Sequence, residues 1–236
     1  MLLDLLSTGS LHFDQFLYGG IRTGMITNIL GESGTGKSQF CFTICANLLK
    51  KNENVNIIFI DTSGTFRPER IFEIIEDHYS DKILSNIKYF RPYSIKHQFE
   101  AIKKINEIKP KLVIIDTITS IISVESKNIA RHLILMKFIH ELAHLAINNN
   151  CAIVTTNMVR NIFYSNNNNN IANNKNINQK EIKLQREVME KSVALSVHIK
   201  LKFEILSLTD NIYKASFLQP LINDSFLFRI TKKGVI

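Results

Sequence analysis

One stretch of the sequence combines residue types and spacing that suit the binding of a nucleotide's phosphates. Residues 31–38 read Gly-Glu-Ser-Gly-Thr-Gly-Lys-Ser and fit the pattern G-x-x-x-x-G-K-[ST]. Glycines let backbone N–H groups approach a polyphosphate closely, and the N-terminus of the following helix adds positive potential. Lys37 would reach the β- and γ-phosphates, and Ser38 would ligate Mg²⁺. The pattern therefore predicts a phosphate-binding loop formed by Gly31, Glu32, Ser33, Gly34, Thr35, Gly36, Lys37 and Ser38.

A Mg²⁺ ion at such a loop needs a second, acidic group nearby. Asp116 is the last residue of the apolar run 111–116. Because ligands of open α/β sheets gather at the C-terminal ends of the strands, Asp116 is the predicted second metal residue, acting through water beside Ser38. Asp61 ends the run 55–61 in a similar position and begins a separate motif.

A second pattern, His140-Glu-Leu-Ala-His144, fits the zinc-protease signature H-E-x-x-H. Two histidines four residues apart share a helix face, and Glu141 could act as a base. However, no third ligand follows at a recognisable spacing, and the small and apolar neighbours suit packing against a sheet. We therefore favour an ordinary packing helix and keep a zinc hydrolase as a distant alternative. Metal binding or oxidation is similarly less favoured than buried packing for Cys41 and Cys45.

Short apolar runs alternate with helix-like segments along the first two thirds of the chain. The runs are 25–30, 55–61, 86–90, 111–116 and 151–156, and the expected helices are 38–50, 68–79, 95–108 and 129–147. Pro68 suits the first turn of a helix, where its missing N–H has no cost. Near-continuous apolar strands alternating with helices predict an α/β fold with a mostly parallel central sheet covered on both faces. Three later segments predict added antiparallel strands: 196–206, 213–220 and 225–231.

Composition narrows the class of protein. A length of 236 residues suits one domain spanning 1–236. The three cysteines, an odd number with no C-x-x-C, suit a reducing compartment. No apolar run reaches the ~18 residues of a membrane span, and the first residues lack the basic start of a signal peptide. We therefore expect a soluble protein without membrane contact, in the cytoplasm, or in the nucleus if the source is eukaryotic.

The positive charge is concentrated in one region. The net charge of the chain is +8. Residues 160–202 hold eight Lys or Arg and three Glu, so this region alone contributes +5 to the net charge. Within this region residues 161–185 are rich in Asn and lack a usable hydrophobic period, which predicts a mobile loop. The charge indicates an anionic partner, but net charge alone cannot say which anion.

With these residues in place, the chain resembles the RecA/RadA recombinase family in its archaeal and eukaryotic branch. The matching segments are the phosphate-binding loop with the residues before it, FIDTSGTFRPERI, KLVIIDTITSI, IVTTNMV and FRITKKGVI. The resemblance implies a RecA-type P-loop NTPase core with ATP and Mg²⁺ as ligands, and it places Arg70 against the adenine. The short chain is similar to archaeal RadB proteins and some eukaryotic recombinase paralogues. It therefore implies that the family's small helical N-terminal domain is absent.

The resemblance also implies two DNA-binding loops. The first falls at about 121–129 and the second at 159–190, where Phe163 and Tyr164 could stack on bases. Basic side chains in these loops would neutralise DNA phosphates. The candidates are Lys127, Arg131, Arg160, Lys175, Lys180, Lys183 and Arg186. A solvated low-complexity insertion is the competing interpretation of the second loop.

Two departures from the family pattern affect the chemistry. Ser63 stands where the family has its catalytic glutamate, and Met158 stands where it has a glutamine that senses the γ-phosphate. A hydroxyl is a poor general base, and a positioned base contributes ~10²–10⁴-fold to a rate. No catalytic residue is assigned, and the interpretation is ATP binding with slow hydrolysis.

These features favour a RadB-like accessory protein of homologous recombination and DNA repair. It would bind ATP and single-stranded DNA and assist a full-length RadA-type recombinase, with homo- or hetero-oligomerisation left open. One alternative is an active DNA-dependent ATPase that performs strand exchange. Another is a RecA-like regulatory ATPase with no DNA role, and single-stranded DNA binding would separate the two classes.

Overall fold

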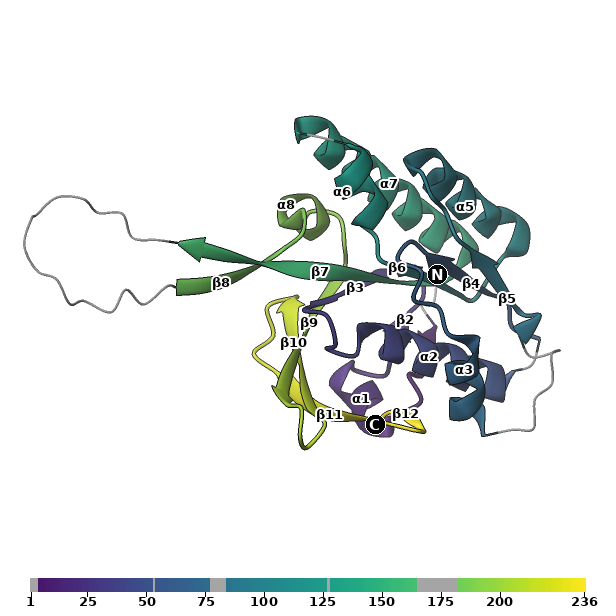
Figure 1. Ribbon diagram of the computed structural model, residues 1–236. Helices are drawn as coiled ribbons and strands as arrows, with labels where there is room; N and C mark the ends of the chain where they lie inside the picture. Colours follow the sequence, from purple (N-terminus) through teal and green to yellow (C-terminus); the bar gives the residue numbers. More distant parts are fainter. Residues whose placement is uncertain (1–3, 53, 77–83, 127, 165–181) are drawn as a thin grey trace, which may run out of the picture.

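The computed structural model describes residues 4–52, 54–76, 84–126, 128–164 and 182–236. Within them, the chain forms a central twisted sheet with helices on both faces (Figure 1). The predicted α/β fold is confirmed. None of the helices in these ranges is long and apolar enough to cross a membrane.

Five neighbouring parallel strands of the sheet come from the five predicted apolar runs. In order across the sheet, the strands are β5 (Ile87–Phe90), β4 (Ile57–Asp61), β6 (Leu112–Asp116), β7 (Ala152–Tyr164) and β3 (Ile26–Gly31). Neighbours in this series all pair in parallel. The residues of β3, β4 and β6 are buried throughout, as strands covered on both faces require. The C-terminal ends of β3, β4 and β6 therefore meet at one edge.

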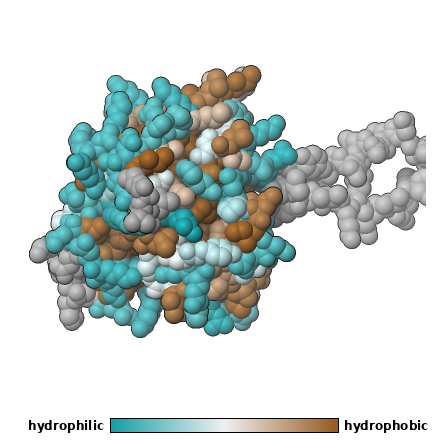
Figure 2. Space-filling model, turned by 180° about the vertical axis from the view of Figure 1, so that it is seen from behind, coloured by the Kyte–Doolittle hydropathy of each residue, from teal (hydrophilic) through white to brown (hydrophobic). Residues whose placement is uncertain are grey.

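Two separate apolar clusters cover the two faces of the sheet. One cluster contains side chains of α1 (Leu11–Phe16), α2 (Lys37–Lys51) and α3 (Pro68–Ile75). The other contains side chains of α5 (Ile95–Ile108), α6 (Ser120–Glu125), α7 (Asn128–Asn149) and α8 (Glu190–Ala194). Pro68 occupies the first turn of α3, as predicted. Seen from behind, the surface mixes hydrophilic and hydrophobic residues (Figure 2).

The C-terminal part of the chain extends the sheet beyond β3. Strand β9 (Ile199–Ser207) pairs in parallel with β3, and β10 (Ile212–Gln219), β11 (Ser225–Thr231) and β12 (Gly234–Val235) follow in antiparallel pairs. The prediction of antiparallel strands is confirmed for the pairs β9–β10 and β10–β11, whereas β9 itself joins β3 in parallel. Phe203 and Phe228, from β9 and β11, pack around Phe13 of α1. This packing brings the end of the chain close to α2. A small sheet of β1 (Leu5–Leu6) and β2 (Ile21–Arg22) flanks α1.

The prediction that 161–185 is a loop is wrong at both of its ends. Strand β7 continues to Tyr164 and pairs in antiparallel register with β8 (Ile182–Glu187), from Val159 opposite Glu187 to Tyr164 opposite Ile182. The two strands form a ribbon that projects from the body of the molecule (Figure 1). Backbone hydrogen bonds between two strands do not require a hydrophobic period, so the strands could not be predicted from hydrophobic periodicity. Residues 165–181, with Lys175 and Lys180, lie outside the described residues.

Candidate nucleotide site

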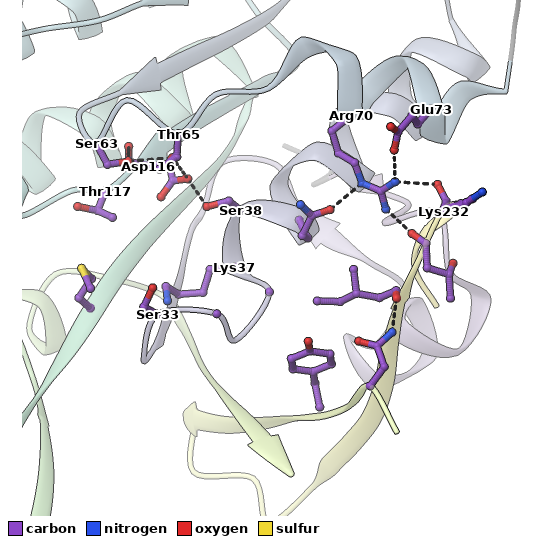
Figure 3. Close-up of a pocket in the computed structure, with 18 residues that line it drawn as sticks. Ser33, Lys37, Ser38, Ser63, Thr65, Arg70, Glu73, Asp116, Thr117 and Lys232 are labelled. Atoms are coloured by element: carbon purple, nitrogen blue, oxygen red, sulfur yellow. Dashed lines mark hydrogen bonds and ion pairs between the residues drawn. The ribbon is translucent and has the colours of Figure 1, made fainter. Parts of the chain in front are cut away.

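A cleft of about 710 Å³ opens at the C-terminal edge of the parallel strands. Figure 3 shows the side chains that line it. The predicted residues Ser33, Gly34, Gly36, Lys37, Ser38, Arg70 and Asp116 all contribute to its wall, as do Ser63 and Met158. Gly31, Glu32 and Thr35 complete the loop behind this wall. The structure therefore gathers one predicted set of residues, drawn from four parts of the chain, around one cavity.

The loop between β3 and α2 is tightly packed at its two glycine ends. A Cβ atom on Gly31 would lie 2.4 Å from the carbonyl oxygen of Phe203, so the position accepts no side chain. Gly36 has a φ of 89°, which favours glycine, and a Cβ there would lie 2.7 Å from Ile230 Cδ1. Strands β9 and β11 therefore determine the shape of the loop together with its own sequence.

The Lys37 side chain lies inside the loop. Its Nζ donates hydrogen bonds to the carbonyl oxygens of Gly31 at 2.9 Å and Glu32 at 2.6 Å. The side chain is largely buried, and this burial lowers the pKa of Lys37 below its ordinary value despite the neighbouring Asp116 carboxylate. A phosphate group entering the loop would offer this ammonium an anionic partner, which is a stronger hydrogen-bond acceptor than a carbonyl.

Asp116 and Ser38, the two residues predicted to hold Mg²⁺, lie in direct contact. Ser38 Oγ donates a hydrogen bond of 2.6 Å to Asp116 Oδ2, and Thr156 donates to the other carboxylate oxygen. Thr65 Oγ1 lies 3.4 Å from Asp116 Oδ2 (Figure 3). A hydroxyl and a carboxylate at the mouth of a phosphate loop are the hard oxygen ligands that Mg²⁺ takes. The residues present therefore fit a Mg²⁺ ion bound with a nucleotide.

Asp61 has a different role from Asp116. It is fully buried, and its carboxylate accepts hydrogen bonds from the backbone N–H groups of residues 63–66, at 2.7–3.2 Å. Burial alone would raise the pKa of Asp61, but these N–H donors outweigh it and lower the pKa below its ordinary value. Asp61 thus stabilises the turn that places Ser63 and Thr65 at the cleft. Its carboxylate oxygens are occupied by the hydrogen bonds from this turn.

Ser63 and Met158 face the cleft from two sides. The Ser63 hydroxyl lies 3.2 Å from Asp61 Oδ1, 3.2 Å from the Asp116 carbonyl oxygen and 2.9 Å from Thr65 Oγ1. It is thus part of a local hydroxyl and carbonyl network and supplies no carboxylate. Met158 follows the buried part of β7, pairs with Gly31, and is 43% exposed. Its thioether offers no N–H donor to a phosphate.

Arg70 is held in place by four acceptors at the rim of the cleft. Its Nε donates to Gln39 Oε1 at 2.8 Å, and its Nη1 donates to Glu73 Oε2 at 2.7 Å and to the Lys232 carbonyl at 3.1 Å. Its Nη2 donates to the Thr231 carbonyl. Figure 3 shows the guanidinium between α3 and the C-terminal strands. This fixed, planar cation could stack against a nucleotide base.

Arg70→Ala is expected to weaken ATP binding about tenfold, because a base stacked on a guanidinium is worth ~0.5–2 kcal/mol. Isothermal titration calorimetry with a non-hydrolysable ATP analogue would measure the affinity. The matched control is Arg67→Ala, which removes an exposed arginine just before α3 that does not line the cleft. Equal affinities for the two variants would contradict the stacking role.

Sequence reasoning gave no site role to the C-terminal strands. Asn211, Tyr213, Ile230, Thr231 and Lys232 all line the cleft, and so do Gln39 and Glu73. The first five lie more than 170 residues from the phosphate loop and have no local pattern that points to it. The FRITKKGVI segment formed part of the family resemblance, and this was the one sequence signal that pointed to a role for these residues.

A second cavity, of about 250 Å³, lies at the base of the β7–β8 ribbon. Its lining brings together Arg131 of α7, Arg160 of β7 and Arg186 of β8, with His132 beside them. Arg131 Nε is buried and has no hydrogen-bond partner among the described residues. Arg186 Nε lies 3.4 Å from Glu190 Oε2. Three of the seven predicted DNA-binding residues therefore converge. Lys183 lies on β8, and Lys127 is outside the described residues.

A buried polar network joins this arginine cavity to the nucleotide cleft. Glu187, at the end of β8, forms an ion pair with Lys200 of β9, and the two side chains are only 2% and 7% exposed. Asn157 Nδ2 donates to Glu187 Oε1 at 2.8 Å, and Asn157 Oδ1 accepts from Thr119 Oγ1 at 2.6 Å and from the Met158 backbone N–H at 2.9 Å. Asn157 therefore contacts the ribbon base, the start of α6 and the cleft residue Met158.

The remaining candidate groups lie elsewhere. His140 and His144 are exposed on α7, and the described residues contain no group of three or more His, Cys, Asp or Glu that could hold a metal ion. Cys41 and Cys45 are fully buried in α2, and burial raises the pKa of both thiols. Thiols of this kind are unreactive packing residues.

The strand order and the phosphate loop at the head of α2 define a P-loop NTPase with a RecA-type core. Comparison with known proteins makes this more specific. The family model for Rad51 matches residues 2–199, and the chain belongs to the Rad51 family.

Individual relatives agree with this membership. The chain is 37% identical over 171 residues to a DNA repair and recombination protein RadA of Cenarchaeum symbiosum, covering 66% of this chain and 43% of that protein. It is 36% identical over 168 residues to a DNA repair protein RAD51 homolog B of Zea mays, covering 65% and 49%. A RadA protein of Ignicoccus hospitalis is 34% identical over 186 residues, covering 70% and 57%. The matched part thus spans about half the length of these curated relatives.

Proposed function

We propose that this chain binds ATP with Mg²⁺ and single-stranded DNA, hydrolyses ATP slowly, and acts as an accessory protein in homologous recombination and DNA repair. The observation that carries the proposal is the content of the cleft. Lys37, Ser38 and Asp116 are arranged for a triphosphate and its metal, while Ser63 and Met158 occupy the positions of the family's hydrolytic and sensing groups. The relatives described above are DNA repair or recombination proteins, which supports the biological setting.

In this proposal each residue of the cleft has a defined task. The backbone N–H groups of the loop bind the phosphates, with Lys37 as their counter-charge. Ser38 and Asp116 hold Mg²⁺, which supplies charge neutralisation when it is bound with the nucleotide. Arg70 fixes the base, and Asp61 keeps the 63–66 turn in its position at the opposite wall.

Hydrolysis is slow because Ser63 takes the position of the family's general base. Among the described residues, two acidic side chains line the cleft: Asp116, which holds the metal, and Glu73, which pairs with Arg70. The hydroxyl of Ser63 stands beside Asp116, whose carboxylate accepts hydrogen bonds from Ser38, Thr65 and Thr156. An alcohol does not take a proton from water near neutral pH, so the ~10²–10⁴-fold contribution of a positioned base is missing. Nucleotide binding, rather than turnover, then sets the conformational state of the chain.

The DNA-binding part of the proposal rests on the arginine cavity at the ribbon base. Arg131, Arg160 and Arg186 come from three elements and line one cavity, which suits phosphate groups of a nucleic acid backbone. Asn157 connects this cavity to Met158 in the cleft through the contacts described above. A coupling free energy of ~1–3 kcal/mol between ATP and DNA would be typical of two linked sites.

Replacement of any one of Arg131, Arg160 and Arg186 by alanine is expected to weaken single-stranded DNA binding. When one phosphate contact is lost, DNA binding releases fewer counterions. The magnitude of the slope of log affinity against log salt concentration should therefore fall by ~0.7 per arginine. Fluorescence anisotropy with labelled oligonucleotides of two base compositions, at a series of salt concentrations with ATP and Mg²⁺ present, would measure this. Both oligonucleotides should lose affinity by a similar factor.

Lys103→Ala is the control for the loss of one positive charge, since Lys103 is exposed on α5 away from the cavity. It should leave the salt slope unchanged. Absence of DNA binding by the wild-type chain with ATP present would reject the DNA role and favour a RecA-like regulatory ATPase. A wild-type slope in all three arginine variants would place the DNA elsewhere.

A further inference from the structure

The nucleotide cleft and the arginine cavity leave one sequence motif unused, the pair His140 and His144 on α7. Both residues are exposed, on the same face of a helix that packs against the sheet through its opposite side, with Leu142 and Ala146 buried. The motif therefore lies outside the proposed ATP and DNA sites and has a surface of its own.

The two imidazole rings converge. His144 Nε2 and His140 Nε2 share a hydrogen bond of 3.0 Å, with the ring centroids 4.4 Å apart and the ring planes at 83°. Two imidazole nitrogens that bind one Zn²⁺ ion, each at its usual bond length, lie roughly 2.9–3.4 Å apart for bond angles between a right angle and a tetrahedral one. The observed separation falls in this range, so an ion that replaces the hydrogen-bonded proton between the two nitrogens requires little movement of the side chains.

The surroundings leave this pair open to an ion. Lys137, one turn before His140, directs its Nζ over the Phe99 ring at 5.9 Å, and Glu141 is the adjacent acidic residue. Imidazole suits divalent transition metals of the zinc and copper type, whereas Mg²⁺ and Ca²⁺ take oxygen ligands. The donor set therefore selects a chemical class of ion different from the one expected at the phosphate loop.

We infer that His140 and His144 form a two-histidine chelate for a divalent transition metal ion, with Zn²⁺ as the representative ion. The remaining coordination positions belong to water. The site spans one turn of α7, so the bound ion links successive turns of this helix and stabilises its folded form. The chelate makes no use of Glu141 as a base and includes no hydrolytic step.

The test is a Zn²⁺ titration of the whole chain by isothermal titration calorimetry in a buffer that does not bind metals. One ion per chain is expected. His140→Ala and His144→Ala should each lower the affinity by about tenfold or more, because loss of a direct ligand costs at least as much as loss of a group that supports one. His12→Ala is the matched control, since His12 is exposed on α1 and lies outside the pair. It should retain the wild-type affinity.

Two further readouts separate chelation from a folding defect. Zn²⁺ should raise the Tm of the wild-type chain and of His12→Ala, and it should leave the Tm of the two pair variants unchanged. Circular dichroism without metal should be the same for all four proteins. Wild-type Zn²⁺ affinity in either pair variant, or no binding by the wild-type chain at zinc far in excess of protein, would overturn the inference.

Discussion

Lys37→Ala is expected to weaken ATP binding at least about 100-fold, a loss of ~2.7 kcal/mol. The Lys37 ammonium lies inside the phosphate loop, and its charged hydrogen bonds to phosphate oxygens would each be worth ~1.5–3 kcal/mol. The substitution also removes the hydrogen bonds from Nζ to the Gly31 and Glu32 carbonyls, which link the lysine to the backbone of the loop. Competition with a fluorescent ATP analogue would measure the change.

Lys51→Ala is the control, because Lys51 is an exposed lysine in the last turn of the same helix. It should bind ATP as the wild-type chain does. Thermal unfolding of both variants would establish that they are folded. Lys37→Ala with near wild-type affinity would contradict the assignment of the cleft as a triphosphate site.

Glu187→Ala is expected to lower the free energy of unfolding by ~3–5 kcal/mol. The substitution leaves the Lys200 ammonium buried without its anionic partner, and it also removes an acceptor used by Asn28 and Asn157. Urea unfolding followed by circular dichroism would measure the loss. The double variant Glu187→Ala with Lys200→Met should recover part of it, because it removes the unpaired buried charge.

Glu190→Ala provides the matched comparison, since Glu190 pairs with Arg186 at 3.4 Å on the exposed surface. An exposed pair contributes ~0–1 kcal/mol, so this variant should remain near wild-type stability. Equal stabilities for Glu187→Ala and Glu190→Ala would mean that the buried network does not hold the ribbon base to the core.

The parallel core could be predicted because each of its signals is local. The apolar runs that end at Gly31, Asp61 and Asp116 have the length and flanks of buried strands, and the loop pattern at 31–38 needs a strand before it and a helix after it. Chain connectivity then places these strand ends at one edge. The position of Asp116 beside Ser38 follows from that arrangement, and it could therefore be predicted.

The contacts that could not be predicted are formed by residues far apart in the sequence. Arg70 is fixed by carbonyls of Thr231 and Lys232, and Glu187 by Lys200, and no local pattern encodes either pairing. Asp61 resembled Asp116 in the sequence, and the backbone geometry of the following turn separates them. The β7–β8 ribbon depends on backbone pairing across an Asn-rich segment, where composition suggested a loop.

The proposed function requires a cleft that keeps the binding groups for ATP and has Ser63 in place of the base for its hydrolysis. The most direct test is steady-state ATP hydrolysis with saturating single-stranded DNA by the wild-type chain, Ser63→Glu and Lys37→Ala. We expect wild-type turnover close to the Lys37→Ala background, and a rise of about tenfold in Ser63→Glu. A new carboxylate restores part of the ~10²–10⁴-fold contribution of a base, while Met158 still lacks the sensing amide. Wild-type turnover as fast as that of an active recombinase, unaffected by Ser63→Glu, would contradict the account.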